Sequence, residues 1–202
     1  MARPMHIEPT DIIEAAKQCI QQRGLANTTL KEVAAEAGVT QGTIYYHFKT
    51  KEELMLAVLK SSIYECIDLV EKAWVETGSP ATKLASALDV SKESFGKRDD
   101  LHRLVYNMIV YGLQNVHAAI ECGQLIHCCQ QVIERCCLEI HEAIGPSRLP
   151  APAPLSRIIY AFFLGLSMQS LFDPEVDIDE DYDSFTKMIL DLMKCRPEKT
   201  NQ

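Results

Sequence analysis

Residues 28–51 read TTLKEVAAEAGVTQGTIYYHFKTK, and this stretch decides the fold of the chain. Thr29 and Glu32 form a Thr-x-x-Glu capping box, which predicts the start of a helix. Apolar residues recur at helical spacing behind it, and Gly38 predicts the end of that helix. A second short helical pattern begins two residues later. Residues 29–48 therefore predict a helix-turn-helix motif, in which the second helix enters the major groove of DNA.

The polar side chains of this motif suit contacts with DNA. At the start of the second helix, Gln41 and its threonine neighbours can hydrogen-bond to base edges, and Gly42 lets the backbone approach the duplex. Lys51 falls in the first turn of the next helix, so its charge and that helix N-terminus together predict a phosphate clamp. The tyrosines and histidine supply donors for sugar and phosphate contacts. The residues expected to contact DNA are Thr28, Thr29, Thr40, Gln41, Gly42, Thr43, Tyr45, Tyr46, His47 and Lys51.

Several apolar residues of the motif are assigned to a small core that holds the helices together, and not to DNA contact. They are Leu30, Val33, Ala34, Ala37, Val39, Ile44 and Phe48. An ordinary surface turn in an all-α protein is the alternative interpretation. Two capping boxes, a glycine turn and a phosphate clamp in one segment favour the DNA-binding interpretation.

The motif resembles the DNA-binding domain of the TetR family of bacterial repressors, and the resemblance covers roughly residues 10–60. It implies an all-α protein of about nine helices. Three N-terminal helices would form the DNA-binding domain, expected over residues 6–66. Residues 67–202 would form a helical domain that binds an effector and dimerises through its last two long helices. The implied partners are double-stranded operator DNA, a second copy of the chain and an unknown small-molecule effector, with no cofactor.

Charge is divided unevenly along the 202 residues, which carry a net charge of -8. Residues 1–60 hold seven basic and seven acidic side chains, so the remainder holds the whole negative excess. The total excludes a uniformly basic nucleic-acid binder of the histone kind. The neutral N-terminal segment can approach phosphates, whereas the acidic remainder is repelled by them.

Helical patterns also dominate the rest of the chain, with no internal repeat. We expect Thr10 to cap the first helix, and Asp183 or Ser184 to cap the last one. Four prolines between residues 145 and 154 predict an exposed connector. Further helices are expected over residues 81–95, 99–115, 117–144, 155–172 and 182–194. The acidic run 173–183 imitates the start of a calcium loop, but it lacks the required glycine and glutamate, so we expect a solvated loop.

The helix over residues 155–172 is apolar on nearly all sides, so it must bury both its faces. One face can pack in its own core, and the other predicts a homodimer in which Gly165 permits close approach. The expected dimer-interface residues are Ile159, Phe162, Phe163, Leu166 and Ser170. Polar or aromatic groups on apolar helices are candidates for an effector pocket, although each also suits core packing. They are His102, Tyr106, Tyr111, Gln114 and Met168.

Eight cysteines raise the question of disulfides or metal binding. The N-terminus lacks a secretory signal, and the apolar run 158–172 is too short and too polar for a membrane span. We therefore expect a cytoplasmic protein with reduced thiols, no membrane and no metal site. Cys122, Cys129 and Cys136 are spaced by seven, about 10.5 Å apart on one helix stripe, which is too far for a disulfide and typical of core packing. Two alternatives remain open for residues 122–141, which include Cys137 and His141: a metal or thiol sensor, and an all-α Cys/His enzyme. No nucleophile–base pair at a recognisable spacing supports catalysis.

Overall fold

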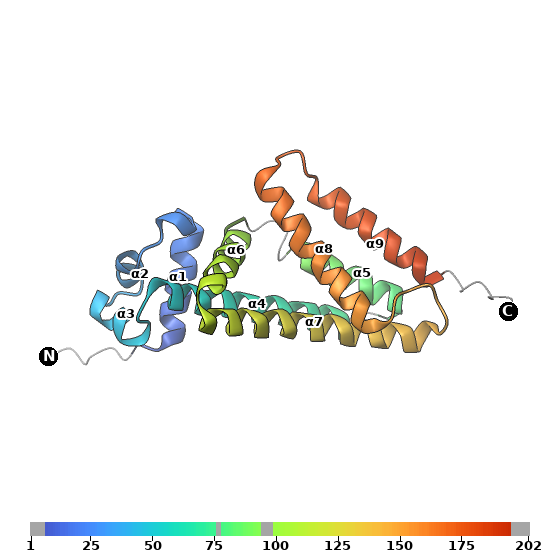
Figure 1. The fold of residues 1–202 in the computed structure, drawn as a ribbon, viewed down its shortest axis with the longest axis horizontal. Coiled ribbons are helices and arrows are strands. Elements are labelled where there is room, and N and C mark those ends of the chain that lie inside the picture. The colour runs from blue at the N-terminus through green and yellow to red at the C-terminus, as the bar shows by residue number, and fades with distance from the viewer. Residues whose placement is uncertain (1–6, 76–77, 94–98, 195–202) are drawn as a thin grey trace. The chain divides into compact units, whose positions relative to one another are not determined.

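The computed structural model describes residues 7–75, 78–93 and 99–194. Within these ranges all regular secondary structure is helical, which confirms the predicted all-α class (Figure 1). A 3-10 turn, η1 (Leu25–Asn27), follows the first helix. The helices are α1 (Pro9–Arg23), α2 (Leu30–Glu36), α3 (Gln41–His47), α4 (Lys51–Val75), α5 (Pro80–Ser91), α6 (Asp99–Gln114), α7 (Val116–Ile144), α8 (Pro152–Phe172) and α9 (Ile178–Lys194).

The chain divides into two compact units. The N-terminal unit contains residues up to Ile63 together with residues 100–122, and therefore holds α1–α3, the first half of α4, α6 and the start of α7. The C-terminal unit contains residues 64–99 and those from Gly123 onward. The sequence did not indicate that α6 packs with the N-terminal helices. The domain boundary expected between residues 66 and 67 stays a prediction.

The core of the N-terminal unit comes from the apolar faces of its short helices. Ile12 of α1, Val33 of α2, Ile44 of α3 and Leu54 of α4 are completely buried. Polar contacts hold the surrounding helices to this core. Asp100 of α6 accepts a hydrogen bond from the backbone N–H of Leu25 (3.3 Å), which ties α6 to the turn after α1.

In the C-terminal unit, α8 packs against α9 through aromatic stacking. The ring of Phe162 stacks on Phe185 at 3.9 Å between centroids, and Phe163 stacks on Tyr182 at 5.5 Å. The core cluster of this unit draws on α4, α5, α7, α8 and α9. Its buried members are Trp74, Leu84, Ala87, Leu88, Cys136, Cys137, Ile140, Leu149, Leu155, Ile159, Phe185 and Ile189.

Helix ends differ from prediction at two caps. Helix α1 begins at Pro9 and is capped by Glu8 with Asp11 in a reciprocal capping box, so the expected cap at Thr10 is wrong. Helix α9 begins at Ile178, because the Asp177 side chain accepts the backbone N–H of Glu180 (3.0 Å). The expected caps Asp183 and Ser184 therefore lie inside α9. The predicted end of α5 at Phe95 falls outside the described residues.

Helix α8 is also the one candidate membrane span among the described residues. With 21 residues, α8 is long and apolar enough to cross a membrane, by length and composition alone. The expectation of no span rested only on the shorter run 158–172. Buried core helices of soluble proteins meet the same criterion. Leu155, Ile159 and Leu166 of α8 are buried inside the C-terminal unit, and 28% of the 18-residue apolar window is buried in all.

Candidate nucleic-acid interface

The helix-turn-helix is built by local hydrogen bonds that the sequence pattern anticipates. Thr29 caps α2, since its Oγ1 accepts the N–H of Glu32 (3.3 Å) while the Glu32 carboxylate accepts the N–H of Thr29 (2.9 Å). The Thr29 hydroxyl also donates to the Glu32 carboxylate (2.8 Å), and this bond, followed by the one from the Thr29 N–H, lowers the pKa of Glu32 from its ordinary value. The predicted capping box at the start of the motif is therefore confirmed.

Gly38 makes the turn between α2 and α3. Its φ of 66° lies in the left-handed region, which glycine adopts without strain. The N–H of Gly38 donates to Ala35 O (3.2 Å), and the N–H of Val39 donates to Ala34 O (2.9 Å). This is the Schellman pattern that ends a helix at a glycine. Thr40 then starts α3, with its Oγ1 accepting the N–H of Thr43 (3.3 Å).

Helix α3 has one buried and one exposed side. Ile44 is completely buried, and Phe48 just after the helix is buried as well. Gln41 and Gly42 are exposed, as are Tyr45 and Tyr46, whose exposed fractions are 45% and 76%. A short helix that presents an amide and two tyrosines to solvent has the side chains needed to meet base edges and phosphates.

Two of the expected DNA contacts lie in less open positions. Thr28 is completely buried, and its hydroxyl donates to the Gly24 carbonyl (3.0 Å), so this side chain is turned into its own unit. His47 is half-buried, with its ring edge-on to Tyr46 at 5.0 Å between centroids. The hydroxyls of Thr40 and Thr43 lie 3.1 Å apart at the start of α3. All ten DNA contacts stay predictions.

Helix α4 starts directly behind the motif, with Lys51 as its first residue. The sequence predicts a second capping box at Thr50 and Glu53, and Thr50 Oγ1 accepts the N–H of Glu53 (3.1 Å), as that box requires. The returning bond differs by one position, because the Glu53 carboxylate accepts the N–H of Lys49 (2.7 Å) and not that of Thr50. The Lys51 side chain is half-buried at this helix N-terminus, where backbone N–H groups favour an anion.

Lys49 belongs to this surface although the sequence interpretation did not include it. Its Nζ donates to the carbonyls of Tyr45 (3.3 Å) and Tyr46 (3.2 Å), and lies 6.0 Å from the centre of the Tyr46 ring. The signal in the sequence was the spacing of three residues between Tyr46 and Lys49.

The expected effector-pocket residues belong to both compact units of the chain. Four of them lie on α6 in the N-terminal unit, where His102 is buried, Tyr106 and Tyr111 are half-buried and Gln114 is exposed. Met168 belongs to the C-terminal unit and has an exposed fraction of 49%. The pocket assignment therefore stays a prediction.

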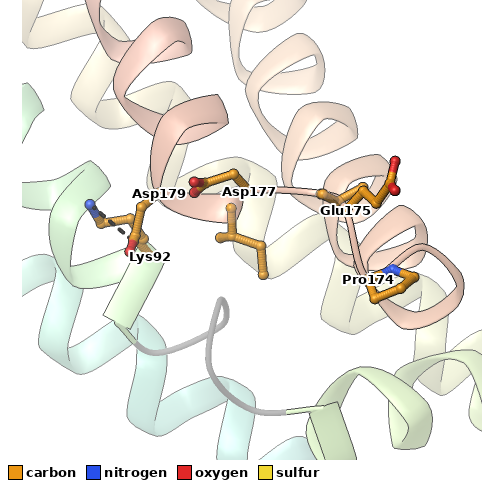
Figure 2. A pocket seen from close by; sticks show the side chains of 7 residues that line it. Lys92, Pro174, Glu175, Asp177 and Asp179 are labelled. Carbon is orange, nitrogen blue, oxygen red and sulfur yellow. Dashed lines mark ion pairs between the residues drawn. The ribbon is translucent and has the colours of Figure 1, made fainter.

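A cavity of about 410 Å³ lies in the C-terminal unit, beside the connection between α8 and α9. Figure 2 shows the side chains that line it. None of the five expected pocket residues lines it. Lys92 at the end of α5 pairs there with Asp179 and, nearby, with Asp183, at 3.5 Å each. The lining residues are Lys92, Pro174, Glu175, Val176, Asp177, Ile178 and Asp179.

The expected dimer residues on α8 mostly face the interior of their own protomer. Ile159 and Leu166 are buried, and Phe162 and Phe163 stack against α9. Ser170 is half-buried and donates its hydroxyl to the Ser167 carbonyl (2.9 Å). The opposite side of α8 carries a stripe of exposed residues at spacings of three and four, with the half-buried Gly165 among them. This outward stripe consists of Pro154, Ile158, Ala161, Gly165, Met168 and Phe172.

Of the five cysteines of α7, Cys136 and Cys137 are buried in the core, and the other three are half-buried. Burial raises the pKa of the thiols of Cys129, Cys136 and Cys137 to about 12, so they stay protonated at neutral pH. His141 Nδ1 hydrogen-bonds to the carbonyl of Cys137 (2.8 Å). Over the described ranges, no group of three or more His, Cys, Asp or Glu side chains is arranged to hold a metal ion. The sensor alternative for residues 122–141 gains no support.

Comparison with known proteins agrees with this geometry. Residues 12–58 match the family model described as bacterial regulatory proteins, tetR family. The HTH-type transcriptional regulator TtgR of Pseudomonas putida is 48% identical over 62 residues, which span 31% of this chain and 29% of TtgR. The chain thus matches less than a third of the length of that relative.

Two further similarities extend over most of the chain. The HTH-type transcriptional regulator AcrR of Shigella flexneri is 26% identical over 197 residues, covering 94% of this chain and 91% of AcrR. A transcriptional regulator from Saccharomonospora viridis, solved in complex with choline, superposes with a TM-score of 0.74 at 19% identity. That superposition covers 90% of this chain and 95% of the other, and it shows a shared fold.

Proposed function

The chain is a TetR-family protein by its DNA-binding domain and its fold, and on that premise we propose that it is a homodimeric, ligand-responsive transcription regulator that acts as a repressor. Each protomer would place the residues from Gln41 to His47 in one major groove of a palindromic operator. A small molecule would release the protein from this site. The protein would act in the cytoplasm, without catalysis, cofactor or membrane.

The observation that carries the proposal is the exposed side of α3, a helix held in place by caps at both of its neighbours. The amide of Gln41 can hydrogen-bond to either donor or acceptor groups on base edges, because it has both N–H donors and an acceptor oxygen. Tyr45 and Tyr46 flank it with exposed phenols. Lys51 at the start of α4 supports a phosphate contact on the same unit.

Charge supports specific over general binding. The first 60 residues are neutral, and the remainder carries the net charge of -8. A protein with this charge has little electrostatic attraction to DNA of arbitrary sequence, so its affinity for an operator depends on a few specific contacts. Each phosphate that it neutralises contributes a slope of about −0.9 to the log–log dependence of affinity on salt.

The outward stripe of α8 supports the homodimer. Met168 and Phe172 have exposed fractions of 49% and 83%, and Ile158 is nearly half exposed. Apolar residues at spacings of three and four, with Ala161 and Gly165 between them, suit a close helix–helix contact in a two-fold interface. A palindromic operator has two half-sites about one helical turn apart, so it needs two copies of the reading helix α3, here called the readers. A dimer supplies both.

Helix α4 offers a route by which an effector acts on the reader. It begins at Lys51, directly behind the helix-turn-helix, and continues to Val75, which belongs to the C-terminal unit. A ligand that favours one position of α4 would change the spacing of the two readers. The Saccharomonospora viridis regulator was solved with choline, which supports a small-molecule effector for this chain without identifying it.

Selection of bound fragments from the genomic DNA of the source organism tests the proposal. We expect enrichment of a few fragments that share a palindrome with half-sites about ten base pairs apart. A variant with Gln41→Ala and Lys51→Ala together should enrich nothing. Recovery of fragments with no common sequence by the unaltered protein would contradict the proposal.

A further inference from the structure

We infer that Lys49 is a positioning residue of the DNA-binding surface, which holds the C-terminal turn of α3 and the ring of Tyr46 in the orientation that meets DNA. The part of this inference that concerns DNA rests on the proposed function. The contacts within the free protein do not depend on it.

The first step is the end of α3. This helix has seven residues, and so short a helix has little stability of its own. Its last carbonyls have no partner inside the helix, and a cation near them is favourable. Lys49 Nζ supplies that cation by donating to the carbonyls of Tyr45 (3.3 Å) and Tyr46 (3.2 Å).

The second step is the Tyr46 ring. With an exposed fraction of 76%, this ring extends into solvent, where an aromatic side chain normally samples several rotamers. Lys49 Nζ lies 6.0 Å from the ring centre, within the range of a cation–π contact. His47 meets the same ring edge-on at 5.0 Å. These contacts favour one ring orientation before DNA arrives, which lowers the ordering cost of binding.

The third step is the anchoring of Lys49 itself. Its backbone N–H donates to the Glu53 carboxylate (2.7 Å), and the N–H of Glu53 donates to Thr50 Oγ1 (3.1 Å). The backbone of Lys49 is thereby tied to the first turn of α4, while its side chain is tied to the last turn of α3. Lys49 links the reading helix to the helix that follows it.

The same geometry gives Lys49 a role different from the phosphate contact expected for Lys51. An ammonium group has three N–H donors. Two of those of Lys49 are engaged by the carbonyls of α3, and the group is turned toward the Tyr46 ring. Lys49 therefore acts through Tyr46 and not as a phosphate ligand, and this distinction can be measured.

The free protein provides the first test, by NMR of the lysine side chains without DNA. If the Nζ group lies over the Tyr46 ring, the ring current shifts the terminal methylene protons of Lys49 upfield from those of other lysines. Tyr46→Ala should abolish that shift. A Lys49 resonance at the ordinary lysine position in the unaltered protein would overturn the inference.

Operator binding provides the second test, with Lys49→Met, Lys49→Arg and Tyr46→Ala, and with Lys187→Met on α9 as the matched loss of an exposed lysine. Thermal melting first checks that each variant is folded. We expect Lys49→Met to raise Kd about two- to fivefold, the size of an exposed cation–π contact. Its salt slope should equal that of the unaltered protein. Lys49→Arg should retain affinity, and Lys187→Met should change nothing.

The decisive comparison is made in the Tyr46→Ala background. There Lys49→Met should have a smaller effect than in the unaltered protein, because the ring is absent and only the hydrogen bonds to the carbonyls at the end of α3 remain to be lost. A full effect of Lys49→Met in that background would overturn the inference, as would a salt slope reduced by about 0.9, which marks a phosphate ligand. If even the unaltered protein binds no selected DNA, the proposed function fails, and the NMR result still decides whether Lys49 positions Tyr46.

Discussion

Two residues of the reader differ in what they are expected to contact, although both are polar and near α3. Gln41 is exposed in the first turn of α3, and Lys51 begins α4. A side chain that meets a base edge contributes to sequence preference, whereas one that meets a phosphate contributes to all sequences alike. The roles can be separated by substitution.

We predict that Lys51→Ala weakens binding to operator and to unrelated duplexes by the same factor, and reduces the salt slope by roughly one unit. Gln41→Ala should cost about 1–3 kcal/mol on the operator and relax the preference at one base pair in each half-site. Binding to a panel of single-base operator variants at several salt concentrations measures both. Identical specificity profiles for the two variants would contradict the assignment.

The buried thiols give a prediction about stability and pH. Burial raises the pKa of Cys136 and Cys137 to about 12, whereas a thiol in the unfolded chain titrates near 8.5. A folded-state pKa above the unfolded one means that stability is fully present below about pH 8.5. It is then lost as the pH rises toward 12, at about 1.4 kcal/mol per pH unit for each thiol.

Urea unfolding between pH 8 and pH 11 checks this expectation. Other groups also titrate there, so the comparison is with Cys137→Ala, whose decline with pH should be shallower than that of the unaltered protein. The absolute stability of the variant is lower because of the lost packing, and only the slope is read. Equal slopes for both proteins would show that Cys137 ionises freely in the folded state.

Sequence reasoning about single residues succeeded where the neighbours along the chain decide the environment. Thr29 and Gly38 have the capping and turn roles predicted for them, because each bonds to a residue three positions away. The burial of Thr28 could not be predicted in the same way. Its hydroxyl turns back to Gly24, and nothing in the pattern distinguishes it from Thr29.

At the scale of the element, α2 depends on its N-terminal cap. Thr29→Ala removes the Oγ1 acceptor of the Glu32 N–H and should cost about 1 kcal/mol. In a chain of this size that lowers Tm by about 2–4 °C. Thr29→Ser keeps the acceptor and should melt near the unaltered protein. Calorimetry measures both, and a Thr29→Ala protein as stable as Thr29→Ser would show that the cap contributes nothing.

Helix α8 gives a prediction about its two faces. Met168→Glu places a charge on the outward stripe, so we expect a folded monomer with an unchanged far-ultraviolet spectrum and greatly reduced operator affinity. Leu166→Glu places the charge in the core, where an unpaired carboxylate costs several kcal/mol, so we expect an unstable protein. Light scattering and thermal melting distinguish the two. A Met168→Glu protein that remains dimeric would move the interface away from this stripe.

For α8, the periodicity of apolar residues predicted that the helix needs burial, but not which of its faces packs inside the protomer. The sequence indicated that this helix is apolar on both sides and needs burial on both. It could not say which side packs on α9, because Phe162, Phe163 and Leu166 are no more apolar than Ile158 and Phe172. The stacking of Phe162 on Phe185 settles the inward side, and that pair is 23 positions apart in the chain.

At the scale of the molecule, the fold class and the helix-turn-helix were predictable, since both follow from local patterns and from a motif whose residues are contiguous. The effector pocket stays a prediction. Its expected residues were chosen as polar groups on apolar helices, and the structure divides them between two units. A pocket depends on which helices meet, and that is decided by contacts distant in sequence.

Binding of two copies of this chain to one palindrome can be measured by fluorescence anisotropy with a labelled, genomically selected duplex. At physiological salt we predict an affinity at least about a thousandfold higher than for a scrambled duplex, with two chains bound per duplex. Inserting five base pairs between the half-sites should remove this advantage, because the readers would then face opposite sides of the helix. Equal affinity for the selected, the scrambled and the lengthened duplexes would contradict the account.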